Sequence, residues 1–459
     1  MDRLLDIARR RGAAVLGLGI SGLAAAEHLL SSGVRPLYLL EQRPSEAAEM
    51  LVRRGACLVP TLNGHAFGLL VRSPGIPERH DAVRYAREIG AVVTGEIGLW
   101  FSASRIPSLA VTGSDGKTTT VTLAHAMLTE GGKRALLGGN IGASLLPMLD
   151  SPDAELAVLE LSSFQLLDAF PLERPRETPS RGAILNLSEN HLDFHGTIDE
   201  YFSAKKKILA EDTLPILPLS LAELGRGFSG IAHLFSPFDA KVPYPARLYF
   251  PQSGSLLCRE ASGETRRLAS LSGFRLQGEH NLKNLLAAVA LCDGLVSGEA
   301  IERAIMTAEP VDRRMTEIGR FRGAVCIDSS IDSTPSRTAT TLRAIRSDSI
   351  VLLLGGASKN LSTAPLTEAL DARVRAIFTF GREGRRLFDA IGESGFRGEL
   401  TLCHGFDEAV LSAASHLTEG DTLLLSPACT SYDEFQSYTE RSRRFRALLR
   451  LDPKGSEKI

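Results

Sequence analysis

The residues best suited to chemistry in this sequence lie in a glycine-rich segment at 111–120, which reads Val-Thr-Gly-Ser-Asp-Gly-Lys-Thr-Thr-Thr. An apolar run before it predicts a strand, and the apolar spacing after it predicts a helix. Glycines let successive backbone N–H groups surround a phosphate at a helix N-terminus. Lys117 can then reach the outer phosphates, and the Thr118 hydroxyl can hold Mg²⁺, so we predict nucleotide binding rather than an ordinary strand–turn–helix connection. The predicted phosphate-binding residues are Gly113, Ser114, Asp115, Gly116, Lys117, Thr118 and Thr119.

Polar side chains follow the next predicted strands of the same segment. Glu160 ends the apolar run 157–159, and a carboxylate beside a phosphate loop is where a further Mg²⁺ ligand belongs. Asn140 follows two glycines and offers an amide to a polar ligand. His191 follows a third such strand, which favours a functional role over the structural role more usual for a lone histidine. The segment 201–207 begins a predicted helix, and a lysine run such as its residues 205–207 is usually a solvated face.

A second glycine motif lies near the start of the chain, at 17–22, between a predicted strand and a predicted helix. A second strand ends at Glu41, close to the distance at which an acid binds a ribose hydroxyl in dinucleotide-binding proteins. The motif is common, so three interpretations stay open: a dinucleotide site, a site for another nucleotide diphosphate, or a unit without a ligand. Residues 73–75 form a further predicted loop at the carboxyl edge of this sheet.

Strands alternate with helices through the last third of the chain, as they do in the first two segments. This alternation predicts an α/β fold whose sheets are open and mostly parallel, with ligands at the carboxyl ends of the strands. We expect three domains: residues 1–104, Rossmann-like; residues 105–309, of the phosphate-loop ATPase type; and residues 310–459, again Rossmann-like. A length of 459 residues agrees with that number.

The bulk composition excludes several classes of function. The 52 Lys and Arg residues nearly balance 54 Asp and Glu, so no basic excess indicates nucleic acid or an anionic membrane. The N-terminus does not resemble a signal peptide, and no run approaches the ~18 apolar residues of a membrane span. The six cysteines are scattered without C-x-x-C spacing, which argues against zinc and disulfides. We expect a cytoplasmic monomer that acts on small molecules.

Taken together, these motifs resemble the Mur ligases, the ATP-dependent amino-acid ligases of peptidoglycan synthesis. The resemblance covers nearly the whole chain and is weakest at 211–275. It is closest to the members that join D-glutamate to UDP-N-acetylmuramoyl-L-alanine, because residues 426–435 read Ser-Pro-Ala-Cys-x-Ser-x-Asp-x-Phe. In the family the N-terminal domain binds the uridine diphosphate of the substrate, not a nicotinamide cofactor.

The resemblance implies a reaction through an acyl phosphate, with ATP and two Mg²⁺ sites. Thr118 and Glu160 would hold one Mg²⁺; His191 and a carbamylated Lys205 would hold the other, and the catalytic set would be Lys117, Glu160, His191 and Lys205. Further ATP contacts would come from Asn281, Asn284, Arg314 and Asp328. The UDP-substrate contacts would be Gly19, Ile20, Ser21, Glu41, Arg43, Ser73, Pro74, Gly75, Asn140 and His191. The amino-acid contacts would be Lys359, Ser431, Tyr432 and Tyr438, to which we add Arg337.

The sequence departs from the family pattern after the first C-terminal strand. Where Asp-Ser-Lys-x-Thr-Asn is usual, residues 328–333 read Asp-Ser-Ser-Ile-Asp-Ser, so a lysine and a threonine that face the acceptor are absent. Desolvating an acceptor carboxylate without a cation costs several kcal/mol. We therefore expect Arg337 to offset the missing lysine and to neutralise Asp332; the alternative is that Arg337 only pairs with Asp332. Two smaller departures are Asp115 where Asn is usual and Arg313 where His is usual.

Three other functions compete with this interpretation. The nearest is another amide ligase of the superfamily, with a different amino-acid acceptor or a folate substrate. The glycine motif at 17–22 alone would also fit a nicotinamide-dependent oxidoreductase, against which the second phosphate loop argues. A non-catalytic nucleotide-binding regulator is the third, and the retained Lys117, Glu160, His191 and Lys205 argue against it.

Overall fold

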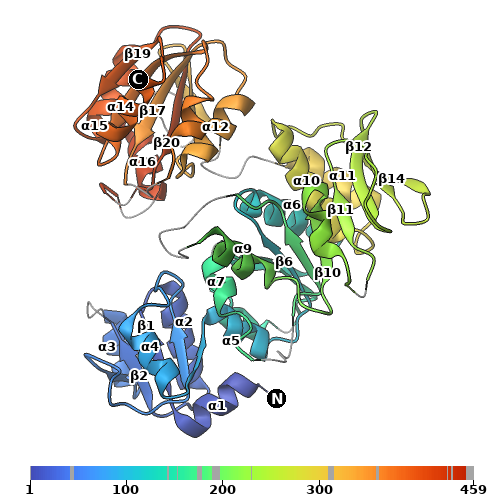
Figure 1. Ribbon diagram of the computed structural model, residues 1–459, viewed down its shortest axis with the longest axis vertical. Coiled ribbons are helices and arrows are strands. Elements are labelled where there is room, and N and C mark those ends of the chain that lie inside the picture. The colour runs from blue at the N-terminus through green and yellow to red at the C-terminus, as the bar shows by residue number, and fades with distance from the viewer. Residues whose placement is uncertain are drawn as a thin grey trace. The chain divides into compact units, whose positions relative to one another are not determined.

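The structure is a computed structural model that describes residues 2–41, 46–141, 144–151, 153–172, 178–188, 197–228, 230–308, 315–357, 361–431, 433–435 and 438–450. The chain forms two compact units. The first comprises Met1–Phe274 and Leu282–Ala308, and the second comprises Arg275–Asn281 and Glu309–Ile459. Among the described residues the first unit contains two β-sheets and the second contains one (Figure 1).

The N-terminal sheet of the first unit is parallel, with strand order β3-β2-β1-β4-β5. Its strands are β1 Ala13–Leu16, β2 Leu37–Leu40, β3 Cys57–Leu58, β4 Leu69–Arg72 and β5 Val92–Thr94. Its helices are α1 Arg3–Arg11, α2 Ile20–Ser31, α3 Glu46–Arg53, α4 Asp81–Glu88 and α5 Glu96–Ala103. Successive residues of β1 are buried in two different apolar clusters, as expected for a strand covered on both faces.

The central sheet has nine strands in the order β14-β13-β12-β11-β10-β9-β6-β8-β7. Its strands are β6 Ser108–Thr112, β7 Ala135–Gly139, β8 Leu156–Glu160, β9 Arg181–Ile184, β10 Leu214–Pro218, β11 His233–Phe235, β12 Arg247–Gln252, β13 Ser255–Arg259 and β14 Thr265–Ser270. Its helices are α6 Lys117–Glu130, η1 Leu146–Asp150, α7 Ser163–Leu167, α9 Ile198–Lys206, η2 Leu219–Gly225, α10 Glu279–Cys292 and α11 Gly298–Thr307. The strand before the phosphate loop, β6, lies between β8 and β9, so the carboxyl ends of all three meet at one edge.

The sheet of the second unit has the order β15-β16-β20-β17-β18-β19. Its strands are β15 Thr316–Phe321, β16 Ala324–Asp328, β17 Ile350–Gly355, β18 Val374–Phe380, β19 Glu399–Leu402 and β20 Thr422–Ala428. Its helices are α12 Pro335–Ala344, α13 Ala364–Thr367, α14 Gly384–Glu393, α15 Phe406–Ser415 and α16 Tyr438–Leu448. Every pairing in it is parallel except that of β15 with β16. Two apolar clusters, one on each face, form its core.

The predicted α/β class with mostly parallel sheets is confirmed. The sequence did not predict the antiparallel edge strand β15, whose residues Thr-Glu-Ile-Gly-Arg-Phe lack an apolar run. The segment 211–275, in which we found few motifs, supplies β10 to β14 and extends the central sheet away from the phosphate loop. No helix in the described part of the chain is long and apolar enough to cross a membrane.

Candidate active site

The glycine-rich segment forms a tight loop between β6 and α6. Gly113 and Gly116 have φ values of 154° and 84°, a region in which side chains are strained. A Cβ at Gly116 would lie 2.2 Å from Oδ1 of Asn284, so only glycine lets α10 approach the loop this closely. Helix α6 begins at Lys117, directly after the loop, and its first N–H groups therefore border the predicted phosphate site.

The strand end beside the loop fixes its shape. The backbone N–H of Asp115 donates to Oδ1 of Asn186 at 2.9 Å, and Nδ2 of Asn186 donates to the Asp115 carbonyl at 3.0 Å. The Ser114 hydroxyl donates to the Ser188 carbonyl at 2.9 Å and lies 3.1 Å from the Tyr201 hydroxyl. We missed Asn186 in the sequence, although its place just after β9 marked it as a neighbour of the loop.

Glu160, at the end of β8, lies beside two of the predicted site residues. It is 2% exposed; its Oε2 accepts a hydrogen bond from the Thr118 hydroxyl at 2.7 Å, and its Oε1 accepts one from Nδ2 of Asn140 at 2.8 Å. Both donors are neutral, and no cation lies within ion-pair distance of this carboxylate in the described part of the chain. A buried carboxylate without a cation is costly, so this pocket of oxygen atoms is suited to a hard divalent cation.

Two lysines converge on one carbonyl oxygen of the loop. The Nζ of Lys117 lies 2.9 Å from the Gly113 oxygen, and the Nζ of Lys205 lies 2.8 Å from the same atom. Lys205 is 2% exposed and its Nζ lies 4.7 Å from the centre of the Tyr201 ring. Lys206 is exposed, whereas the Nζ of Lys207 donates to the Leu167 carbonyl. Of the three lysines of the run, Lys205 is therefore the one that reaches the loop.

The N-terminal glycine motif forms a loop tied to the two other loops of its sheet edge. A Cβ at Gly22 would lie 1.9 Å from the Gly17 oxygen, so the helix packs too closely for any other residue. Oε2 of Glu41 accepts a hydrogen bond from the Leu18 N–H at 2.6 Å, and the Ser73 hydroxyl donates to the Gly17 carbonyl at 2.9 Å. Predicted UDP contacts from all three loops, which include Gly19, Ile20, Ser21, Glu41, Ser73, Pro74 and Gly75, therefore lie at one edge. The Ile20 side chain is 72% exposed there.

The carboxyl edge of the sheet in the second unit contains two buried carboxylates and a buried arginine. Oδ1 of Asp328 accepts hydrogen bonds from the Ser330 backbone N–H at 3.0 Å and from the Ser330 hydroxyl, and Oδ2 accepts one from Ser442. Arg441 is fully buried and donates to the carbonyl oxygens of Ser330, Cys429, Thr430 and Gly355. Burial lowers the pKa of Arg441 to about 10, against the opposing effect of Asp328 and Asp332, so it stays charged at neutral pH.

The expected pairing of Arg337 with Asp332 is wrong. Oδ2 of Asp332 instead accepts hydrogen bonds from the hydroxyls of Thr341 and Ser426, at 2.7 and 2.8 Å. The guanidinium of Arg337 donates to the Ile331 carbonyl at 3.3 Å. Hydroxyls of the same helix and of β20 reach the carboxylate, so its partners are set by packing rather than by proximity in the sequence.

The remaining predicted contacts differ in how far the structure describes them. Asn281 donates from Nδ2 to the Gln277 carbonyl at 2.7 Å, the Ser431 residue is buried, and Tyr438 is 42% exposed at the start of α16. The predicted residues that lie outside the described ranges are Arg43, His191, Arg314, Lys359 and Tyr432, together with Arg313.

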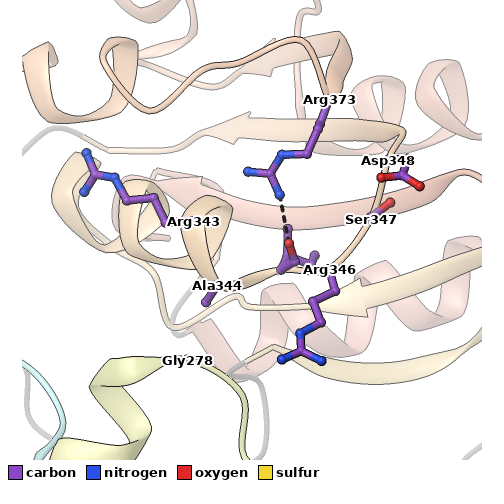
Figure 2. A pocket seen from close by; sticks show the side chains of 8 residues that line it. Gly278, Arg343, Ala344, Arg346, Ser347, Asp348 and Arg373 are labelled. Carbon is purple, nitrogen blue, oxygen red and sulfur yellow. Dashed lines mark hydrogen bonds between the residues drawn. The ribbon is translucent and has the colours of Figure 1, made fainter. Parts of the chain in front are cut away.

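A cavity of about 620 Å³ in the second unit is not part of this site (Figure 2). Its lining residues include Arg343, Arg346 and Arg373, which precede β17 and β18 and therefore lie at the amino ends of the strands. Arg373 donates to the Ile345 carbonyl at 2.9 Å (Figure 2) and pairs with Asp371, so it is held within the protein. A second cavity, of about 390 Å³, likewise lies before the amino end of β6.

Comparison with known proteins gives a consistent result. Residues 111–217 match the model of the Mur ligase middle domain. A UDP-N-acetylmuramoylalanine--D-glutamate ligase of Symbiobacterium thermophilum is 32% identical, over 95% of this chain and 97% of the relative. A relative of the same name from Koribacter versatilis is also 32% identical, over 95% of this chain and 96% of the relative.

Solved structures share the fold at lower identity. The UDP-N-acetylmuramate-alanine ligase MurC of Thermotoga maritima superposes with a TM-score of 0.57 at 19% identity, over 95% of this chain and 98% of that chain. The MurF ligase of the same organism, in complex with ADP, gives a TM-score of 0.57 at 16% identity, over 90% and 95% of the two chains.

Proposed function

This chain belongs to the Mur ligase family, and we propose that it joins D-glutamate to UDP-N-acetylmuramoyl-L-alanine at the expense of ATP, in peptidoglycan precursor synthesis. The full-length relatives of this name support the assignment. The observation that carries the chemistry is the arrangement of Lys117, Thr118 and Glu160 around the phosphate loop. We assign residues 1–104 to the UDP substrate, 105–309 to ATP and 310–459 to the amino acid.

The reaction proceeds in two steps. A carboxylate oxygen of the UDP substrate attacks the γ-phosphorus of ATP, which gives an acyl phosphate and ADP. The amine of the acceptor then attacks the acyl carbon, loses a proton, and expels inorganic phosphate from a tetrahedral intermediate. Several negative oxygens must approach one another in the first step, so it depends on cations held in place beforehand. Lys117, whose Nζ contacts the carbonyl oxygens of Gly113 and Ser114 in the phosphate loop, is the protein cation that we assign to this purpose.

Mg²⁺ fits the buried oxygen pocket at Glu160, where Thr118 and Glu160 would hold it. When bound, Mg²⁺ neutralises phosphate charge during transfer. The protein's own contribution is to orient Glu160 through Asn140 and to hold the loop through Asn186. Glu160 is thereby held at the loop before ATP arrives.

A second metal site would use His191 and a carbamylated Lys205. Two ammonium groups on the same carbonyl oxygen repel each other in a buried site, and carbamylation of Lys205 removes one of them. The resulting anionic oxygen is a ligand type that Mg²⁺ prefers, whereas a free ammonium cannot bind a metal. The buried position of Lys205 supports this role over Lys206 or Lys207.

The acceptor site would lie at the carboxyl edge of the second unit's sheet. We assign Lys359, Ser431, Tyr432, Tyr438 and Arg337 to it. Because Asp332 is engaged by the hydroxyls of Thr341 and Ser426, the guanidinium of Arg337 need not neutralise it. A guanidinium can bind a carboxylate through two hydrogen bonds, which supports Arg337 as a contact for a carboxylate of D-glutamate. We expect the enzyme to act in the cytoplasm as a monomer.

One experiment tests the proposed function directly. Phosphate release and product mass are measured with ATP, Mg²⁺ and UDP-N-acetylmuramoyl-L-alanine, over a panel of D- and L-amino acids. D-Glutamate is expected to give product, and L-glutamate is the matched stereochemical control. Preference for an amine-bearing acceptor would refute the D-glutamate assignment.

A further inference from the structure

One buried guanidinium joins the N-terminal sheet to the helix that follows Glu160. Arg72 ends β4, directly before the Ser73 loop, and its side chain is 3% exposed. Its Nε lies 2.5 Å from Oδ2 of Asp168, its second terminal nitrogen lies 3.1 Å from Glu78, and it donates to the Ile76 carbonyl at 3.1 Å. Arg72 therefore binds the far end of its own loop and a residue of the central region at the same time.

Asp168 ends a short helix that leads back to the metal site. Helix α7 begins three residues after Glu160 and is fixed at its N-terminus by reciprocal hydrogen bonds between Ser162 and Gln165. Leu161 and Leu166 on this segment are fully buried, so it has little room to move independently. A displacement of Asp168 is therefore expected to displace Glu160.

The same helix end also receives the segment that carries Lys205. Helix α7 packs against α9 (Figure 1), and Nζ of Lys207, just past the end of α9, donates to the Leu167 carbonyl at 2.5 Å. The Asp168 carbonyl accepts a further hydrogen bond from the Thr94 hydroxyl at 3.0 Å, which adds a second link to the N-terminal sheet. The end of α7 is thus the point at which the UDP loops and both candidate metal-binding segments meet.

We propose that Arg72 is a positioning residue that couples the UDP-substrate loop at 73–75 to Glu160 through Asp168. The inference rests on the proposed function, because it takes this loop as part of the UDP site. A guanidinium suits the task, because its fork bonds in fixed directions to two carboxylates and a carbonyl. A bound UDP group that orders the loop would stabilise the same Arg72 geometry that holds Asp168. Removal of the Arg72 guanidinium should therefore weaken UDP binding and disturb the position of Glu160.

The experiment measures each side of this coupling separately. We expect Arg72→Leu to weaken UDP binding by at least tenfold in calorimetry and to raise the Mg²⁺ concentration for half-maximal turnover at least threefold. Arg72→Lys keeps the charge without the fork and should give intermediate values for both. Arg84→Ala, which removes an exposed ion pair of α4 in the same sheet region, is the matched control and should change neither. Tm is recorded for every variant.

A double-mutant cycle with Asp168→Leu distinguishes positioning from general stability. If Arg72 acts through Asp168, the double variant should need no more Mg²⁺ than Arg72→Leu alone. Additive effects on the Mg²⁺ requirement, or a lowered Tm with unchanged UDP affinity and Mg²⁺ requirement, would overturn the proposal. If Arg72→Leu does not fold, the UDP affinity and the Mg²⁺ requirement of Arg72→Lys decide the question. If the wild-type enzyme binds UDP and the Arg72 variants keep its UDP affinity and Mg²⁺ requirement, only the coupling is refuted. If the wild-type enzyme does not bind UDP, the proposed UDP site is refuted as well.

Discussion

The carboxyl edges of the central sheet and of the second unit's sheet both bury charge, but they hold it differently. At the central edge, Glu160 accepts hydrogen bonds only from neutral donors among the described residues, and Lys117 and Lys205 donate to the Gly113 carbonyl. At the other edge, the buried Arg441 interacts electrostatically with Asp328 and Asp332, and Arg446 lies 4.0 Å from Asp328, so these charges offset one another within the protein.

This difference indicates which edge is prepared for highly charged ligands. An uncompensated carboxylate and nearby lysines can be neutralised by Mg²⁺ and phosphates, so the central edge gains stability when ATP binds. The charges of the second edge already have partners, and Arg441 is occupied by four carbonyl groups. Under the proposed function, we therefore expect the acceptor to contact side chains around this cluster rather than the cluster itself.

The largest expected effect is at the central edge. Lys117→Ala should abolish ATP turnover, a loss of more than about 10³-fold, because a preorganised cation beside the phosphates is removed. The loop should keep its shape, since Asn186 and the glycines determine it. Phosphate release and Tm are measured, with Lys133→Ala, three residues past the end of α6, as control. Near-normal phosphate release from the folded variant would contradict the role of Lys117.

At the second edge, we expect a substitution to reduce the stability of the fold rather than the rate of the reaction. Arg441→Met removes a buried cation that interacts electrostatically with Asp328 and Asp332, and it leaves four carbonyl groups without its hydrogen bonds, which should lower the free energy of unfolding by about 3–5 kcal/mol. Exposed Arg443→Met on the same helix is the matched control. Chemical denaturation followed by circular dichroism measures the difference, and Asp332→Asn added to Arg441→Met should restore part of it. An unchanged midpoint would show that the charges of this edge are not offset by Arg441.

Lys205 provides a finer test of the central edge. Lys205→Ala should reduce turnover by about 10²-fold, and short carboxylic acids should partly restore it by supplying the lost oxygen ligand. Lys206→Ala is the matched control, because its exposed side chain is one residue away on the same helix. Initial rates with and without the added acid are compared. Full activity of Lys205→Ala would exclude this lysine as a metal ligand.

The smallest expected effect concerns the acceptor. Arg337→Ala should raise the KM for the amino acid at least tenfold, about 1.4 kcal/mol, with little change in the KM for ATP. Arg343→Ala on the same helix is the control, because Arg343 lines the cavity at the opposite edge (Figure 2). An unchanged KM for the acceptor would make Arg337 structural and leave the second edge without this assigned carboxylate contact.

The features that could be predicted from the sequence are those set by residues close together in the chain. The spacing of Gly113, Gly116 and Lys117 is enough to predict the loop, and the end of an apolar run is enough to place Glu160 beside it. The partners of these residues were harder to predict, because contacts such as that of Asn186 with Asp115 join segments that only the sheet order brings together.

Ionic partners were the least predictable feature of the chain. Arg337 and Asp332 are five residues apart, yet hydroxyls from Thr341 and from distant Ser426 occupy the carboxylate. Arg72 and Asp168 are 96 residues apart and carry no motif, yet they form a buried ion pair. Such pairs depend on which groups are desolvated together, and a sequence pattern does not contain that information.

Oxygen transfer tests the central claim, that the loop at Lys117 and Glu160 activates a carboxylate with ATP. UDP-N-acetylmuramoyl-L-alanine labelled with ¹⁸O in both carboxylate oxygens is incubated with ATP and D-glutamate, and the released phosphate is analysed by mass spectrometry. An acyl phosphate transfers one labelled oxygen to each phosphate, so the phosphate formed should carry one ¹⁸O per turnover. Unlabelled phosphate accompanying ligated product would contradict the account.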